Sequence, residues 1–272
     1  MEKQAAIQTS DLAIGYSIRG GKRIVHPQLS LKLHYGELTC LLGRNGAGKS
    51  TLLKTLCGLL PPVGGEVFVS GRPLRGFSPA ELSAKVGVVL TERTQAGGIS
   101  VYDLVSLGRY PHTGFFGTLK ENDHQCVRKA IEAVGLSQKA ERFISELSDG
   151  EKQKAFIAKV LAQECPVIIL DEPTAFLDVT SRIETMLALR KLARGQGKAV
   201  LLSTHDLDTA IQMADCIWLL PAYDSASGKQ PEPMHCGTPD SLTGDGTLEH
   251  FFGNGTIVFD PESRRLISRS GM

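Results

Sequence analysis

The chain has 272 residues, and its 30 Lys and Arg against 29 Asp and Glu give a formal net charge of +1. This length suffices for a sizeable core, whereas the balanced charge gives no support for a broad basic face, so nucleic acid is not an expected partner. No apolar run reaches the length of a membrane-spanning helix, and residues Met1 to Asp11 lack the basic and apolar zones of a secretion signal. The cysteines and histidines show no zinc-ligand spacing.

The first elements are predicted to be β-strands. Apolar and polar residues alternate between Ile7 and Leu33, with a turn at Gly20 and Gly21, which favours an antiparallel hairpin or meander. Tyr16 lies within this stretch. The strand pattern by itself favours Tyr16 as a residue that fills a core.

An apolar strand, a glycine-rich loop and the first turn of a helix follow between Leu38 and Thr51. Gly43, Gly48, Lys49 and Ser50 fit the phosphate-loop pattern, in which backbone N–H groups cradle phosphates and the lysine reaches the β and γ groups. The helix that follows points its N–H groups and positive dipole end at the anion, and the Ser50 hydroxyl is expected on Mg²⁺. The predicted nucleotide contacts of this loop are Gly43, Arg44, Asn45, Gly46, Ala47, Gly48, Lys49 and Ser50.

Further along the chain, buried strands alternate with helices. The apolar runs Val86 to Leu90, Val167 to Leu170 and Ala199 to Ser203 predict parallel strands, and the composition between the first two is mostly helical. This alternation predicts an α/β fold with a mostly parallel sheet, whose ligand site lies at the carboxyl ends of the strands.

Two carboxylates follow the second of these strands. Asp171 suits a Mg²⁺ ligand acting through water, and Glu172 suits the group that orients and deprotonates an attacking water. A lone Asp-Glu pair is more often a solvated turn. The phosphate loop upstream and His205 one strand later favour a nucleotide hydrolase instead.

A second candidate anion seat lies between these motifs. Ser148 and Gly150 in the segment Leu147 to Lys154 precede a predicted helix. The Ser148 hydroxyl and the unpaired N–H groups of the first helical turn could therefore bind an anion. An ordinary helix cap explains the same residues when they are considered alone.

The order and spacing of these motifs resemble the ATP-binding-cassette (ABC) ATPases. The resemblance covers residues 5–245 and implies a P-loop NTPase (RecA-like) core, an antiparallel β subdomain and an inserted α-helical subdomain at about 92–158. Residues 246–272 would form a C-terminal extension, with a possible β-hairpin. The resemblance further implies that two ATP molecules are held between two subunits, with Ser148 and Gly150 of one subunit reaching the γ-phosphate at Lys49 of the other.

The resemblance also implies roles for single residues. Tyr16 corresponds to the aromatic residue that stacks on adenine, Glu172 to the catalytic base and His205 to the histidine that contacts the γ-phosphate. Asp178 corresponds to the aspartate that couples the two sites, and Thr51 to a residue that adds a contact to the phosphates.

Three positions depart from the family pattern. Thr91 stands where a glutamine usually touches Mg²⁺, and Asp149 and Glu151 stand where the family usually has Gly and Gln. An extra carboxylate near the γ-phosphate would repel it unless it points away, so these departures bear on turnover and coupling rather than on ATP binding.

Within the superfamily, Leu107 to His112 and Val160 to Glu164 resemble the cassettes of ferric-siderophore, haem and cobalamin importers. This implies an ATPase that uses ATP and Mg²⁺ at the cytoplasmic face of the inner membrane, as a peripheral homodimer. Its partners would be separate multispanning permease subunits and, indirectly, a solute-binding protein. The segment after Thr91 and the helices up to about Arg142 are expected to dock a permease helix.

Two other functions are weighed against an importer ATPase. A single-cassette ATPase in a non-transport role, such as iron-sulfur cluster assembly, fits the same motifs, and neighbouring permease genes would discriminate the two. A P-loop kinase does not explain Leu147 to Glu151.

Overall fold

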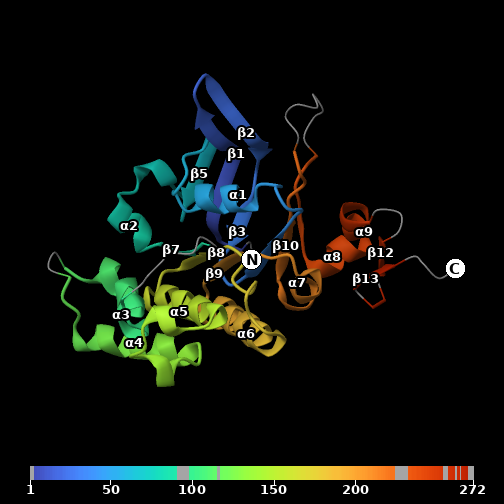
Figure 1. Ribbon diagram of the computed structural model, residues 1–272. Coiled ribbons are helices and arrows are strands. Elements are labelled where there is room, and N and C mark those ends of the chain that lie inside the picture. Colours follow the sequence, from blue (N-terminus) through green and yellow to red (C-terminus); the bar gives the residue numbers. More distant parts are fainter. Residues whose placement is uncertain are drawn as a thin grey trace.

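The computed structural model describes residues 3–90, 98–114, 117–223, 232–253, 257–260, 262–263 and 265–268. Figure 1 shows an antiparallel sheet at the top of the molecule, a second sheet across the middle and a group of helices below it.

The antiparallel sheet is built around the first strand. Its order is β2-β1-β5-β6, and β3 also pairs with β1. The strands are β1 (Ala5–Ile18), β2 (Gly21–Leu29), β3 (Lys32–His34), β5 (Gly64–Val69) and β6 (Arg72–Pro73). The antiparallel pairing of β1 with β2 and β3 confirms the predicted hairpin or meander ahead of the phosphate loop.

The central sheet has the order β11-β10-β4-β9-β8-β7. Its strands are β4 (Leu38–Leu42), β7 (Val86–Val89), β8 (Val167–Leu170), β9 (Ala199–Ser203), β10 (Cys216–Leu219) and β11 (His235–Gly237). All neighbours from β10 to β7 are parallel, and β11 is an antiparallel edge strand. Every residue of β4, β8 and β9 is buried, because both faces of the sheet are covered.

Helices pack on both faces of this sheet. Leu52, Leu53 and Leu56 of α1 (Lys49–Leu56) pack between the two sheets in one hydrophobic cluster. On the other face, α6 (Val179–Gln196) and α7 (Leu207–Met213) contribute to a second cluster. The short α2 (Pro79–Ser83), preceded by η1 (Leu74–Gly76), leads into β7.

A helical region with its own core lies beside the central sheet. Its elements are α3 (Val101–Ser106), η2 (Leu107–His112), α4 (Glu121–Ala133), η3 (Ser137–Lys139), η4 (Ile144–Glu146) and α5 (Asp149–Ala162). Helix α5 extends beyond the boundary expected near residue 158. It is shared between two cores, because Ile157 and Val160 join the cluster of the central sheet while Ala155 and Ala158 join that of the helical region.

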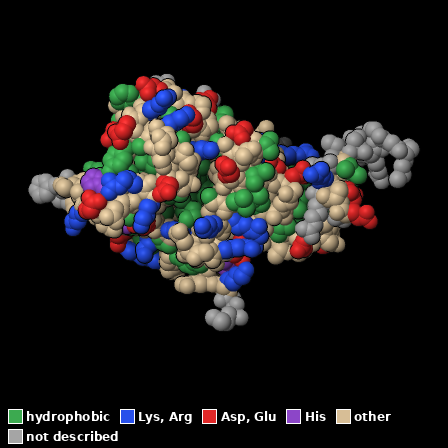
Figure 2. Space-filling view, turned by 90° about the horizontal axis from the view of Figure 1, so that it is seen from below, with side chains coloured by type: hydrophobic (Ala, Val, Ile, Leu, Met, Phe, Trp, Pro, Cys, Tyr) green, Lys and Arg blue, Asp and Glu red, His purple; other side chains and the backbone are tan. Residues whose placement is uncertain are grey.

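The last elements are α8 (Pro239–Gly244), α9 (Thr247–Phe252), β12 (Ile257–Asp260) and β13 (Arg265–Ser268). β12 and β13 pair as an antiparallel hairpin. In the part of the chain described, every helix falls short of the length and hydropathy that crossing a bilayer requires. Acidic and basic side chains are interspersed on the face seen from below the helices (Figure 2).

Candidate nucleotide site

The phosphate loop joins β4 to α1 and depends on its glycines. Gly46 and Gly48 have φ values of +80° and +100°, in the left-handed region that favours glycine. A Cβ on Gly48 would lie 2.4 Å from Val25 Cγ1, and one on Gly43 would lie 2.6 Å from the Leu220 carbonyl oxygen. A side chain at either position would therefore force the loop out of this shape.

The other loop residues divide between surface and interior. Arg44, Asn45 and Ser50 are exposed, whereas Ala47 is buried and donates its N–H to the Arg44 carbonyl at 3.1 Å. Lys49 is buried, and its ammonium donates to the Gly43 carbonyl at 2.9 Å. The loop thus closes on itself through backbone and lysine contacts.

The charge of Lys49 interacts with the carboxylates at the end of β8. Burial lowers the pKa of Lys49, and the negative charges of Glu172 and Asp171 oppose that shift. The predicted phosphate loop and the predicted carboxylate pair are therefore close in space, as expected where parallel strands end at one edge of a sheet.

Ser203 joins the two carboxylate positions. Its fully buried hydroxyl donates to Asp171 Oδ1 at 2.6 Å and accepts the Glu172 N–H at 2.9 Å. Sequence reasoning missed Ser203. A signal was present, since it is the one hydroxyl residue ending an otherwise apolar run, and β8 and β9 pair in the register Leu170 to Leu202.

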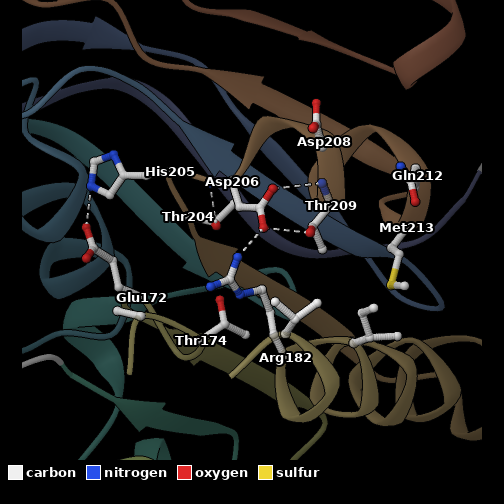
Figure 3. A pocket seen from close by; sticks show the side chains of 13 residues that line it. Glu172, Thr174, Arg182, Thr204, His205, Asp206, Asp208, Thr209, Gln212 and Met213 are labelled. Atoms are coloured by element: carbon white, nitrogen blue, oxygen red, sulfur yellow. Dashed lines mark hydrogen bonds and ion pairs between the residues drawn. The ribbon is translucent and has the colours of Figure 1, made fainter. Parts of the chain in front are cut away.

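Glu172 and His205 point toward each other across the carboxyl ends of β8 and β9 (Figure 3). Glu172 Oε1 lies 2.6 Å from His205 Nε2, and both side chains are partly exposed. Glu172 has a φ of +48°, which is uncommon for a residue other than glycine. Such conformations cluster at active sites, where the surrounding structure holds them.

The backbone after His205 is fixed by a second polar network (Figure 3). Asp206 caps α7 through the Thr209 N–H at 3.0 Å and accepts a hydrogen bond from Arg182 of α6 at 2.9 Å. Burial raises the pKa of Asp206, but these hydrogen bonds outweigh it and lower the pKa overall. They border a cavity of about 600 Å³ that includes Glu172 and His205.

Tyr16 lies at the surface of β1, with 43% of its area exposed. Its hydroxyl is 2.9 Å from Thr51 Oγ1 in the first turn of α1. The strand-pattern interpretation of Tyr16 as a core residue is therefore wrong. Its ring stands next to the phosphate loop with area available for a ligand.

Ser148 and Gly150 stand at the amino end of α5, away from these contacts. The hydrogen bonds of Ser148 form a capping box with Glu151, and a Cβ on Gly150 would lie 3.1 Å from the Phe176 carbonyl oxygen. Asp178, nearby, caps α6 by accepting the Ser181 N–H at 2.9 Å. Among the residues described, no hydrogen bond joins Ser148 to the phosphate loop.

The departures in this segment have local partners. Glu151 accepts the Ser148 N–H at 3.0 Å and forms an ion pair with Lys139. The hydrogen bond from Lys139 and that from the Ser148 backbone hold the pKa of Glu151 below its usual range. Asp149 Oδ1 lies 3.7 Å from Lys152 Nζ. The third departure, Thr91, lies outside the described residues.

The donor set suits Mg²⁺ held jointly with phosphate. Ser50 offers an exposed hydroxyl and Asp171 a buried carboxylate, while the residues described contain no cluster of three or more His, Cys, Asp or Glu that could cage a metal. Mg²⁺ is usually held by one or two protein oxygens together with substrate phosphates and water. The residues present therefore fit the ion.

Known proteins with similar sequences are ABC transporter proteins. The family model described as "ABC transporter" matches residues 27–175, which include the phosphate loop, Ser148 to Glu151 and both carboxylates. The ferric enterobactin transport ATP-binding protein FepC of Escherichia coli strain K12 is 32% identical over 259 residues, covering 95% of this chain and 91% of FepC.

Solved structures show the same fold. A putative metal-chelate type ABC transporter in an inward-facing conformation has a TM-score of 0.73 at 28% identity, covering 91% of this chain and 89% of that one. A dimeric bacterial ABC transporter cassette has a TM-score of 0.72 at 25% identity, covering 79% and 94%. The chain therefore belongs to the ABC transporter family, as one of its ATPase cassettes.

Proposed function

We propose that this chain energises uptake of an iron-siderophore, haem or cobalamin-type compound through separate permease subunits. The observation that carries the proposal is the similarity to a ferric enterobactin transport protein over nearly the whole of both chains. The same similarity disfavours the alternative role in iron-sulfur cluster assembly. The chain would act as a peripheral subunit at the cytoplasmic face of the membrane.

The proposed chemistry follows from the residues around Glu172. The phosphate loop and Lys49 bind the phosphates of ATP, and the Tyr16 ring stacks on adenine. Glu172 accepts a proton from the attacking water, and His205 keeps that carboxylate oriented and contacts the γ-phosphate. Mg²⁺, held by Ser50 and Asp171, would neutralise charge on the phosphates.

The second phosphate contact would come from another copy of the chain. Ser148 and Gly150 lie at the amino end of α5, where helix N–H groups and the dipole favour an anion. A homodimer in which these residues face the partner's ATP, with Asp178 between the two sites, completes both sites. The dimeric cassette that this chain resembles supports that arrangement.

A groove beside the helical region suits a cytoplasmic helix of the permease. It has a volume of about 460 Å³ and is lined by α2, β7, η2 and the end of α5. Leu107 is 48% exposed and Tyr110 is 69% exposed at its rim. In α3, Val101, Leu104 and Val105 are buried, so the large exposed apolar side chains beside the groove are those of Leu107 and Tyr110.

Membrane copurification tests the proposal directly. The chain, expressed with its neighbouring genes, is expected to copurify with a multispanning permease, and adding the transported solute and its binding protein is expected to stimulate ATP hydrolysis. Copurification with a soluble assembly scaffold and no permease would overturn the transport proposal.

Cysteine crosslinking then locates the docking surface. Leu107→Cys and Tyr110→Cys are made in a background in which Cys126, Cys216 and Cys236, none of which is buried, are replaced by serine. The retained Cys40, Cys57 and Cys165 are buried. Burial raises the pKa of each of these thiols, which disfavours the reactive thiolate. The matched control is Ile267→Cys in β13, where the side chain is 44% exposed. Crosslinks to permease loops from Ile267 but not from Leu107 or Tyr110 would place docking elsewhere.

A further inference from the structure

A buried ionic cluster centred on Arg109 lies outside the nucleotide site. Arg109 is only 3% exposed, and its Nε donates to Asp123 Oδ1 of α4 at 2.9 Å. Its Nη1 donates to the Ala162 carbonyl at 2.6 Å and to Glu164 Oε2 at 2.7 Å. A buried charge is tolerated only where it is paired in this way, so the cluster fixes the positions of three chain segments.

The residues on either side of Arg109 bind the same end of α5. A Cβ on Gly108 would lie 2.1 Å from the Lys159 carbonyl oxygen, so η2 rests directly on the backbone of α5. His112 Nε2 lies 2.8 Å from the Gln163 carbonyl oxygen. Segment η2 and the last turn of α5 therefore form one body.

The opposite side of η2 faces the groove. Leu107 and Tyr110, which flank the buried pair Gly108 and Arg109, have exposed side chains and line it. Within Leu107 to His112, Gly108, Arg109 and His112 therefore contact the end of α5, whereas Leu107 and Tyr110 are exposed to the groove. A helix seated in the groove would press on the segment that is pinned to α5.

The other end of α5 carries Ser148 and Gly150. The helix has 14 residues, which corresponds to a rod of about 21 Å. Its flanks pack into both the helical core and the central core, and its 14 residues form one uninterrupted helix that links its two ends. The groove and the second phosphate seat are the two ends of one element.

We infer that Arg109 is a positioning residue that joins the permease groove to the phosphate-contacting end of α5. A displacement of the docked helix is passed through η2 to α5 and shifts Ser148 and Gly150 relative to the ATP of the partner subunit. The inference rests on the proposed transport function. The competing explanation is that the cluster only stabilises the fold.

Variants of the full chain in its complex with the permease, reconstituted in liposomes, separate these explanations. Arg109→Gln removes all three contacts, and Arg109→Lys keeps the charge but loses the planar fork. Glu164→Gln is a milder change, because that side chain is 54% exposed, and it serves if Arg109→Gln does not fold. The matched control is Arg128→Gln, which removes the exposed ion pair of Arg128 with Glu121 on α4.

Four quantities are measured for each variant: copurification with the permease, basal ATP hydrolysis of the isolated chain, solute-stimulated hydrolysis and the unfolding temperature. We expect Arg109→Gln to copurify and to keep basal hydrolysis within about twofold, while the ratio of stimulated to basal hydrolysis falls about tenfold, a typical coupling energy. Arg109→Lys and Glu164→Gln should lower the ratio less, and Arg128→Gln should leave it unchanged.

Two results would overturn the inference. One is a parallel fall of basal and stimulated hydrolysis together with the unfolding temperature, which a purely structural role produces. The other is an unchanged ratio in Arg109→Gln and Glu164→Gln. A wild-type chain that neither copurifies with a permease nor responds to solute refutes the proposed function itself, and that outcome is visible before any variant is tested.

Discussion

The carboxyl ends of β8 and β9 and the helical region α3 to α5 are organised in opposite ways. In the first, Asp171, Glu172, Ser203 and His205 contact one another directly, although they come from two separate strands. In the second, the hydrogen bonds of Ser148 stay within one turn of α5, Glu151 pairs with Lys139, and the buried cluster around Arg109 lies at the other end of the helix.

This difference indicates a division of labour. The groups proposed to hydrolyse ATP are assembled within a single chain, because paired parallel strands with buried residues hold their ends in fixed register. Among the residues described, Ser148 at the amino end of α5 makes no hydrogen bond to the phosphate loop or to the two carboxylates, which suits a segment that meets phosphate on another copy. The helical region is instead anchored where the permease is proposed to dock.

Glu172→Gln should break the preassembled site most severely. The amide keeps the size of the side chain but cannot accept the proton, so hydrolysis should fall by about 10² to 10⁴-fold. Both halves of the dimer remain intact, so ATP and Mg²⁺ should accumulate a dimer visible by size-exclusion chromatography. Lys49→Ala is the control, which should weaken nucleotide binding and abolish the dimer. A Glu172→Gln chain that stays monomeric with ATP, in solution and when crosslinked in the assembled complex, would contradict the shared site.

Ser203→Ala tests whether contact between the strands orders the carboxylates. The change leaves Asp171 Oδ1 and the Glu172 N–H without their buried partner, and the loss of such a bond costs about 1 to 3 kcal/mol. We expect kcat for ATP hydrolysis to fall about tenfold, with a higher Mg²⁺ requirement. The control is Thr185→Ala, which removes a hydroxyl that donates to the Ser181 carbonyl within α6. Equal kcat values for the two variants would argue against a role for Ser203.

Tyr16→Ala should have a smaller effect, confined to binding. Loss of the ring removes stacking on adenine, so the Kd for ATP should rise about tenfold while kcat at saturation changes little. Tyr16→Phe keeps the ring and loses only the contact with Thr51, so its Kd should rise less than about threefold. Titration with a fluorescent ATP analogue measures both. The same Kd for the Ala and Phe variants would exclude stacking.

Glu151→Gln is expected to change hydrolysis least. Its carboxylate is turned toward Lys139 and the Ser148 N–H, so its charge is balanced locally, and removing it should alter kcat by less than about threefold. A large rise in kcat would mean that the carboxylate repels phosphate after all.

The same variant has a pH signature in stability. Because the folded chain lowers the pKa of Glu151 below 4.5, its ionised form stabilises the native state above that pH. The stabilisation relative to Glu151→Gln should therefore be present at neutral pH and disappear as the pH falls below about 4.5, as followed by urea unfolding. If the wild-type chain instead gained stability over Glu151→Gln as the pH fell, the folded state would not lower the pKa of Glu151.

The sequence by itself determined the elements that depend on short-range patterns. Continuous apolar runs specified β4, β8 and β9, glycine spacing specified the phosphate loop, and the common edge of parallel strands implied that Lys49, Asp171 and His205 gather at one end of the sheet. The roles of Tyr16 and Asp178 came only from resemblance, since the strand pattern of Tyr16 pointed to the core.

Only the tertiary structure decided which side chains pair with one another and which are exposed at the surface. The Lys139 partner of Glu151, the Ser203 bridge and the cluster around Arg109 join residues from different elements, and no local periodicity encodes such pairings. The apolar pattern of Val101 to Tyr110 likewise does not separate buried Val105 from exposed Leu107 and Tyr110. The reason is physical: periodicity fixes the face of a helix on which a residue lies, but only the packing of other elements decides which faces are covered.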